Sequence, residues 1–292
     1  MPEKICQYPI DKLRTMCYNV TDNRKRGCRK EKNMKESRIA LRPSYWANVS
    51  GGKDSLFMLK LILSNPDKYP LDGVVHFELE IDYPFIKDVI DYMEQECKRF
   101  GIPFVRMKPR KSWYDLYSQY GFPSRNIRWC NSRYKLDGKK QLDEWMRSRG
   151  NFVVSYIGYC ADEQKRFAHR KTMNVTEVYP LVDAGIQEST ILEWAKEQAI
   201  FNNYYLSNKR CGCMYCPLSS MINYAYLFKY YPQRFQFMIS CMKQTEAWME
   251  KNIGHPYSCI SGKPKYNASY LEQIVKTKWV HVLNKKERED QT

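Results

Sequence analysis

The chain has 292 residues, of which 43% are hydrophobic and 14% aromatic. This is enough apolar material for one large core with an appendage, or for two modest domains. No apolar run approaches the roughly 20 residues that span a bilayer, which excludes an integral membrane protein and leads us to expect a cytoplasmic one. With 48 Lys and Arg against 32 Asp and Glu, the formal net charge is +16, which favours polyanionic partners such as nucleotides, tRNA or DNA.

The eleven cysteines do not indicate a disulfide framework. Their number is odd, the chain is long and no export signal precedes it, so we expect reduced thiols. Cys6, Cys17 and Cys28 recur every eleven residues in a basic segment. That spacing is not a known metal-ligand pattern and no histidine joins them, which favours isolated thiols over a metal site.

Three regions follow from the change in pattern along the chain. Residues 1–43 are basic and lack apolar periodicity, so they are predicted to form an N-terminal extension. Residues 44–205 alternate between apolar runs and amphipathic segments, and residues 206–292 begin with clustered cysteines and continue as an aromatic, helical region. The aromatic stripe from Tyr224 to Phe237 is more typical of core packing than of base stacking.

The middle region predicts an α/β fold. The expected strands are 45–49, 73–79, 103–107 and 152–157, and the expected helices are 54–63, 85–100, 136–147, one from about 161, and 187–199. Strands joined by single helices form a parallel, doubly wound, Rossmann-like sheet that is covered on both faces. In such sheets ligands bind at the carboxyl ends of the strands.

A phosphate-binding loop is predicted between the first strand and the first helix. Glycines let backbone N–H groups approach phosphate oxygens, and the start of the helix adds partial positive charge. A lysine supplies a full charge, and two serine hydroxyls can donate to the same oxygens. The loop is formed by Ser50, Gly51, Gly52, Lys53, Asp54 and Ser55. It is not a Walker A loop, because GxxxxGK[ST] is absent.

This hexapeptide resembles the signature of the PP-loop superfamily, which includes the N-type ATP pyrophosphatases and the phosphoadenosine phosphosulfate (PAPS) reductases. Further stretches resemble the PAPS reductase family in particular. They are Arg128-Trp129-Cys130-Asn131 with Lys135 downstream, the segment 157–166 (IGYCADEQKR), Tyr179-Pro180-Leu181-Val182-Asp183, and the segment 209–218 (KRCGCMYCPL).

The resemblance implies roles for several residues. The loop would hold the phosphates of ATP with Mg²⁺, or those of PAPS, and Lys53, Lys135 and Arg166 would be the catalytic cations. Glu78 lies where relatives carry an acidic residue near the nucleoside. The Thr-Gly that usually follows is replaced by Leu79-Glu80.

The cysteine cluster offers soft ligands for a metal centre. Cys211, Cys213 and Cys216 fall within six residues, and Cys130 is expected at the same edge of the sheet. Thiolates at this spacing suit Zn²⁺ or a 4Fe-4S cluster. Four thiolates would close a structural site. Cys130, Cys213 and Cys216 alone would leave one iron open, an arrangement that resembles the iron–sulfur tRNA thiolases. Metal-free thiols or a redox dithiol remain the alternative.

Two reactions and one binding role fit these features. In the favoured reaction, an acceptor attacks the α-phosphate of ATP, pyrophosphate leaves, and the adenylylated acceptor undergoes sulfur transfer. In the second reaction, a thiolate attacks the sulfonate of PAPS or its unphosphorylated relative (APS) and sulfite is released. The chain lacks the Glu-Cys-Gly motif of sulfonucleotide reductases, and Cys259 is a poor substitute. The binding role is a nucleotide-dependent module that binds nucleic acid or serves in defence.

Overall fold

The computed structural model describes residues 43–148, 152–163, 175–254, 256–260 and 263–289. Cys6, Cys17, Cys28 and Arg166 therefore lie outside the described residues. So does most of the helix expected from about residue 161, of which residues 161 and 162 form a turn.

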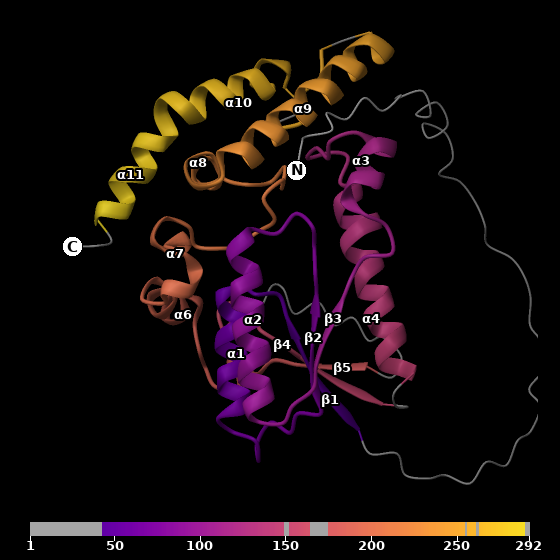
Figure 1. The fold of residues 1–292 in the computed structure, drawn as a ribbon, viewed down its shortest axis with the longest axis vertical. Coiled ribbons are helices and arrows are strands. Elements are labelled where there is room, and N and C mark those ends of the chain that lie inside the picture. Colours follow the sequence, from indigo (N-terminus) through magenta and orange to yellow (C-terminus); the bar gives the residue numbers. More distant parts are fainter. Residues whose placement is uncertain (1–42, 149–151, 164–174, 255, 261–262, 290–292) are drawn as a thin grey trace, which may run out of the picture.

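A five-stranded parallel sheet forms the centre of the chain (Figure 1). Its order is β3-β2-β1-β4-β5, so the chain runs outward from β1 in one direction and then returns to continue in the other. The strands are β1 (Ser44–Val49), β2 (Gly73–Phe77), β3 (Phe104–Met107), β4 (Val153–Ile157) and β5 (Val175–Val178). This order confirms the predicted doubly wound α/β fold and puts the switch point beside β1, where such sheets bind ligands.

Helices connect the strands and then build the C-terminal region. The first set is α1 (Lys53–Leu63), α2 (Pro84–Arg99), α3 (Trp113–Tyr120), a π-helix (Cys130–Lys135) that continues as α4 (Leu136–Ser148), α5 (Pro180–Asp183), α6 (Glu188–Lys196) and α7 (Tyr204–Ser207). The second set is α8 (Met221–Tyr230), α9 (Pro232–Ile253), α10 (Ala268–Ile274) and α11 (Val280–Glu289). The proline at the start of α9 lacks a backbone N–H, so it ends α8 and begins a new helix.

The two faces of the sheet are buried by different helices (Figure 1). Alternate residues of β1 point to opposite faces. Ala47 joins the large core that includes α1 and α2, whereas Trp46 joins a smaller cluster with Met146 of α4. The Trp46 ring meets Trp145 edge-on at 4.8 Å between centroids. Burial on both faces explains why β1 reads as an almost continuous apolar run.

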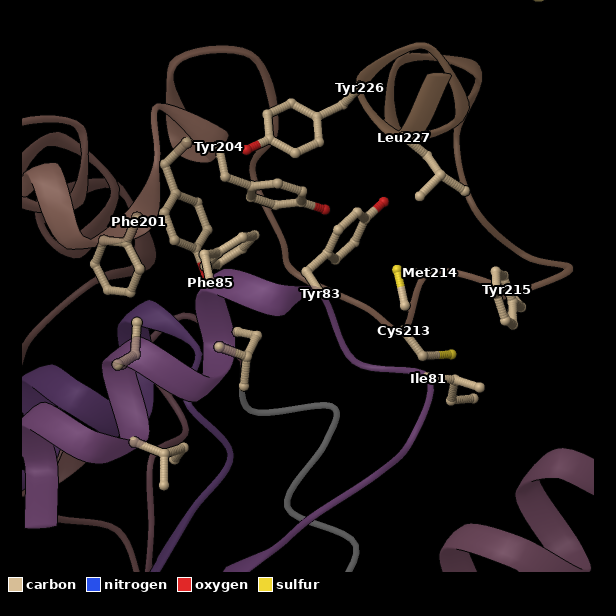
Figure 2. Packing of buried hydrophobic residues seen from close by; sticks show 14 of the residues in the cluster. Ile81, Tyr83, Phe85, Phe201, Tyr204, Cys213, Met214, Tyr215, Tyr226 and Leu227 are labelled. Atoms are coloured by element: carbon tan, nitrogen blue, oxygen red, sulfur yellow. The ribbon is translucent and has the colours of Figure 1, made fainter. Parts of the chain in front are cut away.

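The C-terminal helices α8–α11 lie at one end of the sheet-and-helix body (Figure 1). Their aromatic side chains are mainly core, as predicted, since Tyr224, Tyr226 and Phe235 are all buried. Tyr83, at the start of α2, packs against both Tyr204 of α7 and Tyr226 of α8, which also contact each other (Figure 2). In the part of the chain that the structure describes, no helix is both long and apolar enough to cross a membrane.

Candidate functional site

The predicted phosphate loop lies between the end of β1 and the start of α1. Gly51 has a φ of 75°, a left-handed conformation that L side chains rarely adopt. A Cβ at this position would also lie 2.6 Å from Cγ2 of Ile86 on α2. Backbone conformation and packing therefore both require glycine, and they fix the turn that leads into α1.

Hydrogen bonds inside the loop involve Ser55. Its buried hydroxyl donates to the carbonyl of Gly52 at 2.9 Å and accepts from the backbone N–H of Ser50 at 3.2 Å. Ser55 thus closes the loop on itself, in addition to the phosphate contact predicted for it. The N-cap residue of α1 is Gly52, which has no side chain to cap the helix. The start of α1 is therefore suited to bind an anion.

The side chain of Lys53 is buried although its residue belongs to the phosphate loop. Its side chain is only 1% exposed, and its Nζ lies 2.7 Å from Oδ1 of Asp54 and 3.5 Å from Oε1 of Glu188 on α6. Its backbone N–H donates to the hydroxyl of Tyr205 on α7 at 3.0 Å. The lysine is therefore held by carboxylates next to the loop.

Glu188 also binds Arg210, the residue before Cys211. The Arg210 guanidinium donates from Nε to Oε1 and from Nη2 to Oε2, both at 3.0 Å. Arg210 Nη2 lies 2.9 Å from Oε1 of Glu163 as well. The hydrogen bonds from Arg210, together with the charge of Lys53, hold the pKa of Glu188 below its usual range.

The segment after β4 packs against the first turn of α1. A Cβ at Gly158 would lie 3.0 Å from the carbonyl oxygen of Asp54, so glycine permits this close approach. The buried thiol of Cys160 donates to Asp54 Oδ1 at 3.5 Å, and the backbone N–H of Cys160 donates to Glu163 Oε2 at 3.3 Å. This segment, singled out by its resemblance, is thereby brought to the phosphate loop, while the predicted position of Arg166 over the phosphates lies outside the described residues.

All four predicted metal-binding cysteines interact electrostatically with one lysine, Lys135. The pKa of Lys135 is raised most strongly by its interaction with Cys213, and also by those with Asp82, Cys216 and Cys130. A hydrogen bond from the Cys213 thiol lowers the pKa of Cys216 to about 6, despite partial burial, and Lys135 and Arg128 add to this effect. Lys135, which the resemblance assigned to the phosphates, therefore lies among the thiols.

Cys211 has a different environment. Burial raises its pKa, with Asp82 acting in the same direction, while Lys135 and a hydrogen bond with Tyr204 oppose them. Tyr204 belongs to the aromatic cluster around Tyr83 (Figure 2). The structure thus associates Cys130, Cys213 and Cys216 with one another and Cys211 with α7.

The donor chemistry of the three thiols suits a soft metal, but their arrangement is not that of a formed site. Among the residues that the structure describes, no three His, Cys, Asp or Glu side chains are arranged to hold a metal ion. A metal centre at Cys130, Cys213, Cys216 and Cys211 accordingly stays a prediction, and no chemical step below depends on it.

Several site residues were not found from the sequence. Asp82, Glu188 and Tyr205 are the main ones. Asp82 is half-buried beside Lys135, and burial raises its pKa to about 7.

The cysteine segment contacts the residue before Asp82. The backbone N–H of Met214 donates to the carbonyl of Ile81 at 2.8 Å, so this segment is attached to the chain that follows β2 (Figure 2).

A signal for Asp82 was present in the alternating acidic residues at 78, 80 and 82 directly after β2. The first of them, Glu78, pairs with Arg106 at 3.4 Å and Lys108 at 3.8 Å. Its predicted role near the nucleoside stays a prediction. Glu188 and Tyr205 gave no comparable signal, because their contacts with Lys53 join helices that are far apart in sequence.

Comparisons with known proteins identify relatives of this chain. Residues 44–219 match the phosphoadenosine phosphosulfate reductase domain. An uncharacterized protein of Methanocaldococcus jannaschii is 25% identical over 220 residues, which cover 70% of this chain and 44% of that protein. A second uncharacterized protein of the same organism is 24% identical over 210 residues, which cover 68% of this chain and 47% of that protein. The chain thus spans less than half the length of these curated relatives.

Among solved structures, the U34-tRNA thiolase NcsA from Methanococcus maripaludis, with its 4Fe-4S cluster, is similar to this chain. The sequence identity is 16% and the TM-score 0.38, and the match covers 82% of this chain and 76% of that one.

Proposed function

Because the chain belongs to the phosphoadenosine phosphosulfate reductase family, we propose that its phosphate loop binds ATP or a related adenine nucleotide for reaction at the α-phosphate. In this reaction an acceptor oxygen forms a bond to the α-phosphorus, and the bond to the β-phosphate oxygen breaks. Pyrophosphate leaves along the loop, and a sulfur nucleophile then displaces AMP from the adenylylated acceptor.

One observation carries the proposal: the cysteine segment and the lysine of the phosphate loop are paired with the same carboxylate. Arg210, adjacent to Cys211, and Lys53 of the loop both pair with the carboxylate of Glu188. A nucleotide held by the loop would therefore lie close to the segment that carries Cys211, Cys213 and Cys216. This juxtaposition supports chemistry that joins a nucleotide to sulfur.

The residues of the loop have distinct tasks in this mechanism. The start of α1 and Lys53 would neutralise charge on the departing pyrophosphate, which is mainly electrostatic catalysis. Mg²⁺ prefers oxygen ligands, and Asp54, whose partly exposed carboxylate lies 2.7 Å from Nζ of the loop lysine, offers oxygen atoms of this kind. When bound, Mg²⁺ would supply further neutralisation of the phosphates.

Reduction of PAPS to sulfite is the less favoured reaction. It needs a thiolate that can reach the sulfonate. Cys259 is fully buried, its pKa is raised by burial, and its backbone N–H donates to Glu246 at 3.0 Å. These contacts make it a structural residue, so a reductase would have to use one of the cysteines near the loop.

The test compares binding and products for ATP and PAPS. Calorimetry with each nucleotide and Mg²⁺ should give binding that Lys53→Met weakens by about 10- to 150-fold, the effect of losing a charge-assisted contact of ~1.5–3 kcal/mol. Lys87→Met removes a 73% exposed lysine of α2 and serves as the control. Release of pyrophosphate from ATP, with sulfide and unfractionated tRNA as candidate co-substrates, supports the proposal. Sulfite release from PAPS supports the reductase, and binding without either product supports a binding module.

A further inference from the structure

The phosphate loop and the cysteine segment share one carboxylate. Lys53 Nζ lies 3.5 Å from Glu188 Oε1, and the same oxygen accepts from Arg210 Nε at 3.0 Å. The Glu188 side chain is 21% exposed and that of Lys53 only 1%. A pairing so enclosed is screened less by salt than a surface ion pair.

A second connection runs through consecutive residues of α7. The hydroxyl of Tyr205 accepts from the backbone N–H of Lys53 at 3.0 Å, and the hydroxyl of Tyr204 donates to the carbonyl of Arg210 at 3.1 Å. Both tyrosines are buried. The start of α1 and Arg210 are thus connected twice, through the side chain of Glu188 and through the buried tyrosines of α7.

A bound nucleotide would compete with the neighbouring carboxylates for the charge of Lys53. Three carboxylates, those of Asp54, Glu163 and Glu188, surround two cations, Lys53 and Arg210. Phosphate oxygens bound at the loop would attract Lys53 away from Glu188, which would keep Arg210 as its partner.

We propose that Glu188 is a positioning residue that couples nucleotide occupancy of the phosphate loop to the cysteine segment. When Lys53 turns to the phosphates, the full charge of Glu188 acts on Arg210, and the bidentate pair fixes Arg210 and the adjoining Cys211. The inference rests on the proposed nucleotide binding and adds a communication between the two parts of the site.

Alkylation of Cys211 measures this coupling. Iodoacetamide labelling of the full chain, followed by peptide mass spectrometry, gives the rate at Cys211 with and without saturating ATP and Mg²⁺. Coupling free energies between sites are typically 1–3 kcal/mol, so ATP should slow the reaction by about fivefold or more in the wild type. In Glu188→Gln, which keeps the side chain's size, ATP should still bind but the slowing should disappear.

Matched variants separate coupling from folding and from direct shielding. Glu193→Gln changes another glutamate of α6, which is 70% exposed and paired with Lys196, and it should retain the wild-type response to ATP. Arg210→Lys keeps the charge but loses the two-nitrogen fork, so it should lose the response as Glu188→Gln does. Arg210→Lys therefore tests the coupling even if Glu188→Gln fails to fold.

The outcomes distinguish the inference from the function on which it rests. If the wild type binds ATP and the rate at Cys211 does not change, the coupling is wrong although the nucleotide site stands. Slowing that persists in both Glu188→Gln and Arg210→Lys would mean that the nucleotide simply covers Cys211, which also overturns the coupling. Failure of the wild type to bind either ATP or PAPS would overturn the proposed function and the coupling together.

Discussion

Substituting Gly51 with alanine should destabilise the protein more than the same change at a glycine of like conformation. Gly51 and Gly185 have φ angles of 75° and 68°, so each alanine incurs a similar left-handed cost of about 1–2 kcal/mol. At Gly185 a Cβ meets nothing within 4 Å, whereas at Gly51 it lies 2.6 Å from Ile86 Cγ2. The difference between the two variants isolates the steric contribution. It should be about 1–3 kcal/mol, the usual cost of overpacking a core.

Urea unfolding of the two variants measures this difference, and calorimetry with ATP measures its effect on the loop. Gly51→Ala should also weaken ATP binding, because a shift of the loop away from Ile86 of α2 relieves the overlap. Adding Ile86→Ala removes the clashing methyl group, so in that background Gly51→Ala should cost no more than Gly185→Ala. Equal stability of the two single variants, with equal ATP affinity, would refute the view that packing against α2 fixes the loop.

The remaining predictions concern four separate parts of the chain. Ser55→Ala should lower ATP affinity in calorimetry by roughly tenfold or more while the chain stays folded, since it removes a phosphate contact and the bonds that close the loop. If a metal centre forms, Cys211→Ala should keep the metal and Cys216→Ala should lose it, as measured by metal analysis and visible spectra of anaerobic protein. Two lysine partners lower the pKa of Glu272 to about 2. Its stabilisation, about 1 kcal/mol, should therefore be complete above its unfolded pKa near 4.5 and be lost as the pH falls toward 2, so that Glu272→Gln and wild type converge in acid unfolding. Deleting residues 1–43 should reduce both nucleic-acid affinity and its salt dependence, and unchanged binding would assign the basic surplus elsewhere.

Periodicity predicted the central elements because burial determines them. Strands β1 and β4 are enclosed on both faces and carry apolar runs that stand out in the sequence. Strand β5 was missed because it is a four-residue edge strand containing Thr176 and Glu177, which gives no apolar signal. Helix α3 was missed for a related reason: among its eight residues only Trp113 and Leu116 are buried.

The site was predictable where one segment carries the chemistry and not where several segments meet. Gly51 and Ser55 could be identified from a short motif between a strand and a helix. The pairing of Lys53 with Glu188 could not, since it requires α6 to pack beside α1, and this depends on side chains spread across both helices. The aromatic packing that holds Tyr205 against the start of α1 is likewise a property of the folded chain.

Part of the chain's excess of positive charge lies in residues 1–43, which precede the phosphate loop in the sequence. Residues 1–43 contain 12 Lys and Arg against 5 Asp and Glu, so +7 of the formal +16 precedes β1. Among the residues that the structure describes, Lys53 and Arg210 are instead paired with the carboxylates of Asp54, Glu163 and Glu188. The basic surplus therefore says little about nucleotide binding, and it is better attributed to a second polyanion such as a nucleic acid. The nucleotide site instead has to gain its affinity from the start of α1, from the release of Lys53 by its carboxylates, and from a cation such as Mg²⁺ that accompanies the phosphates.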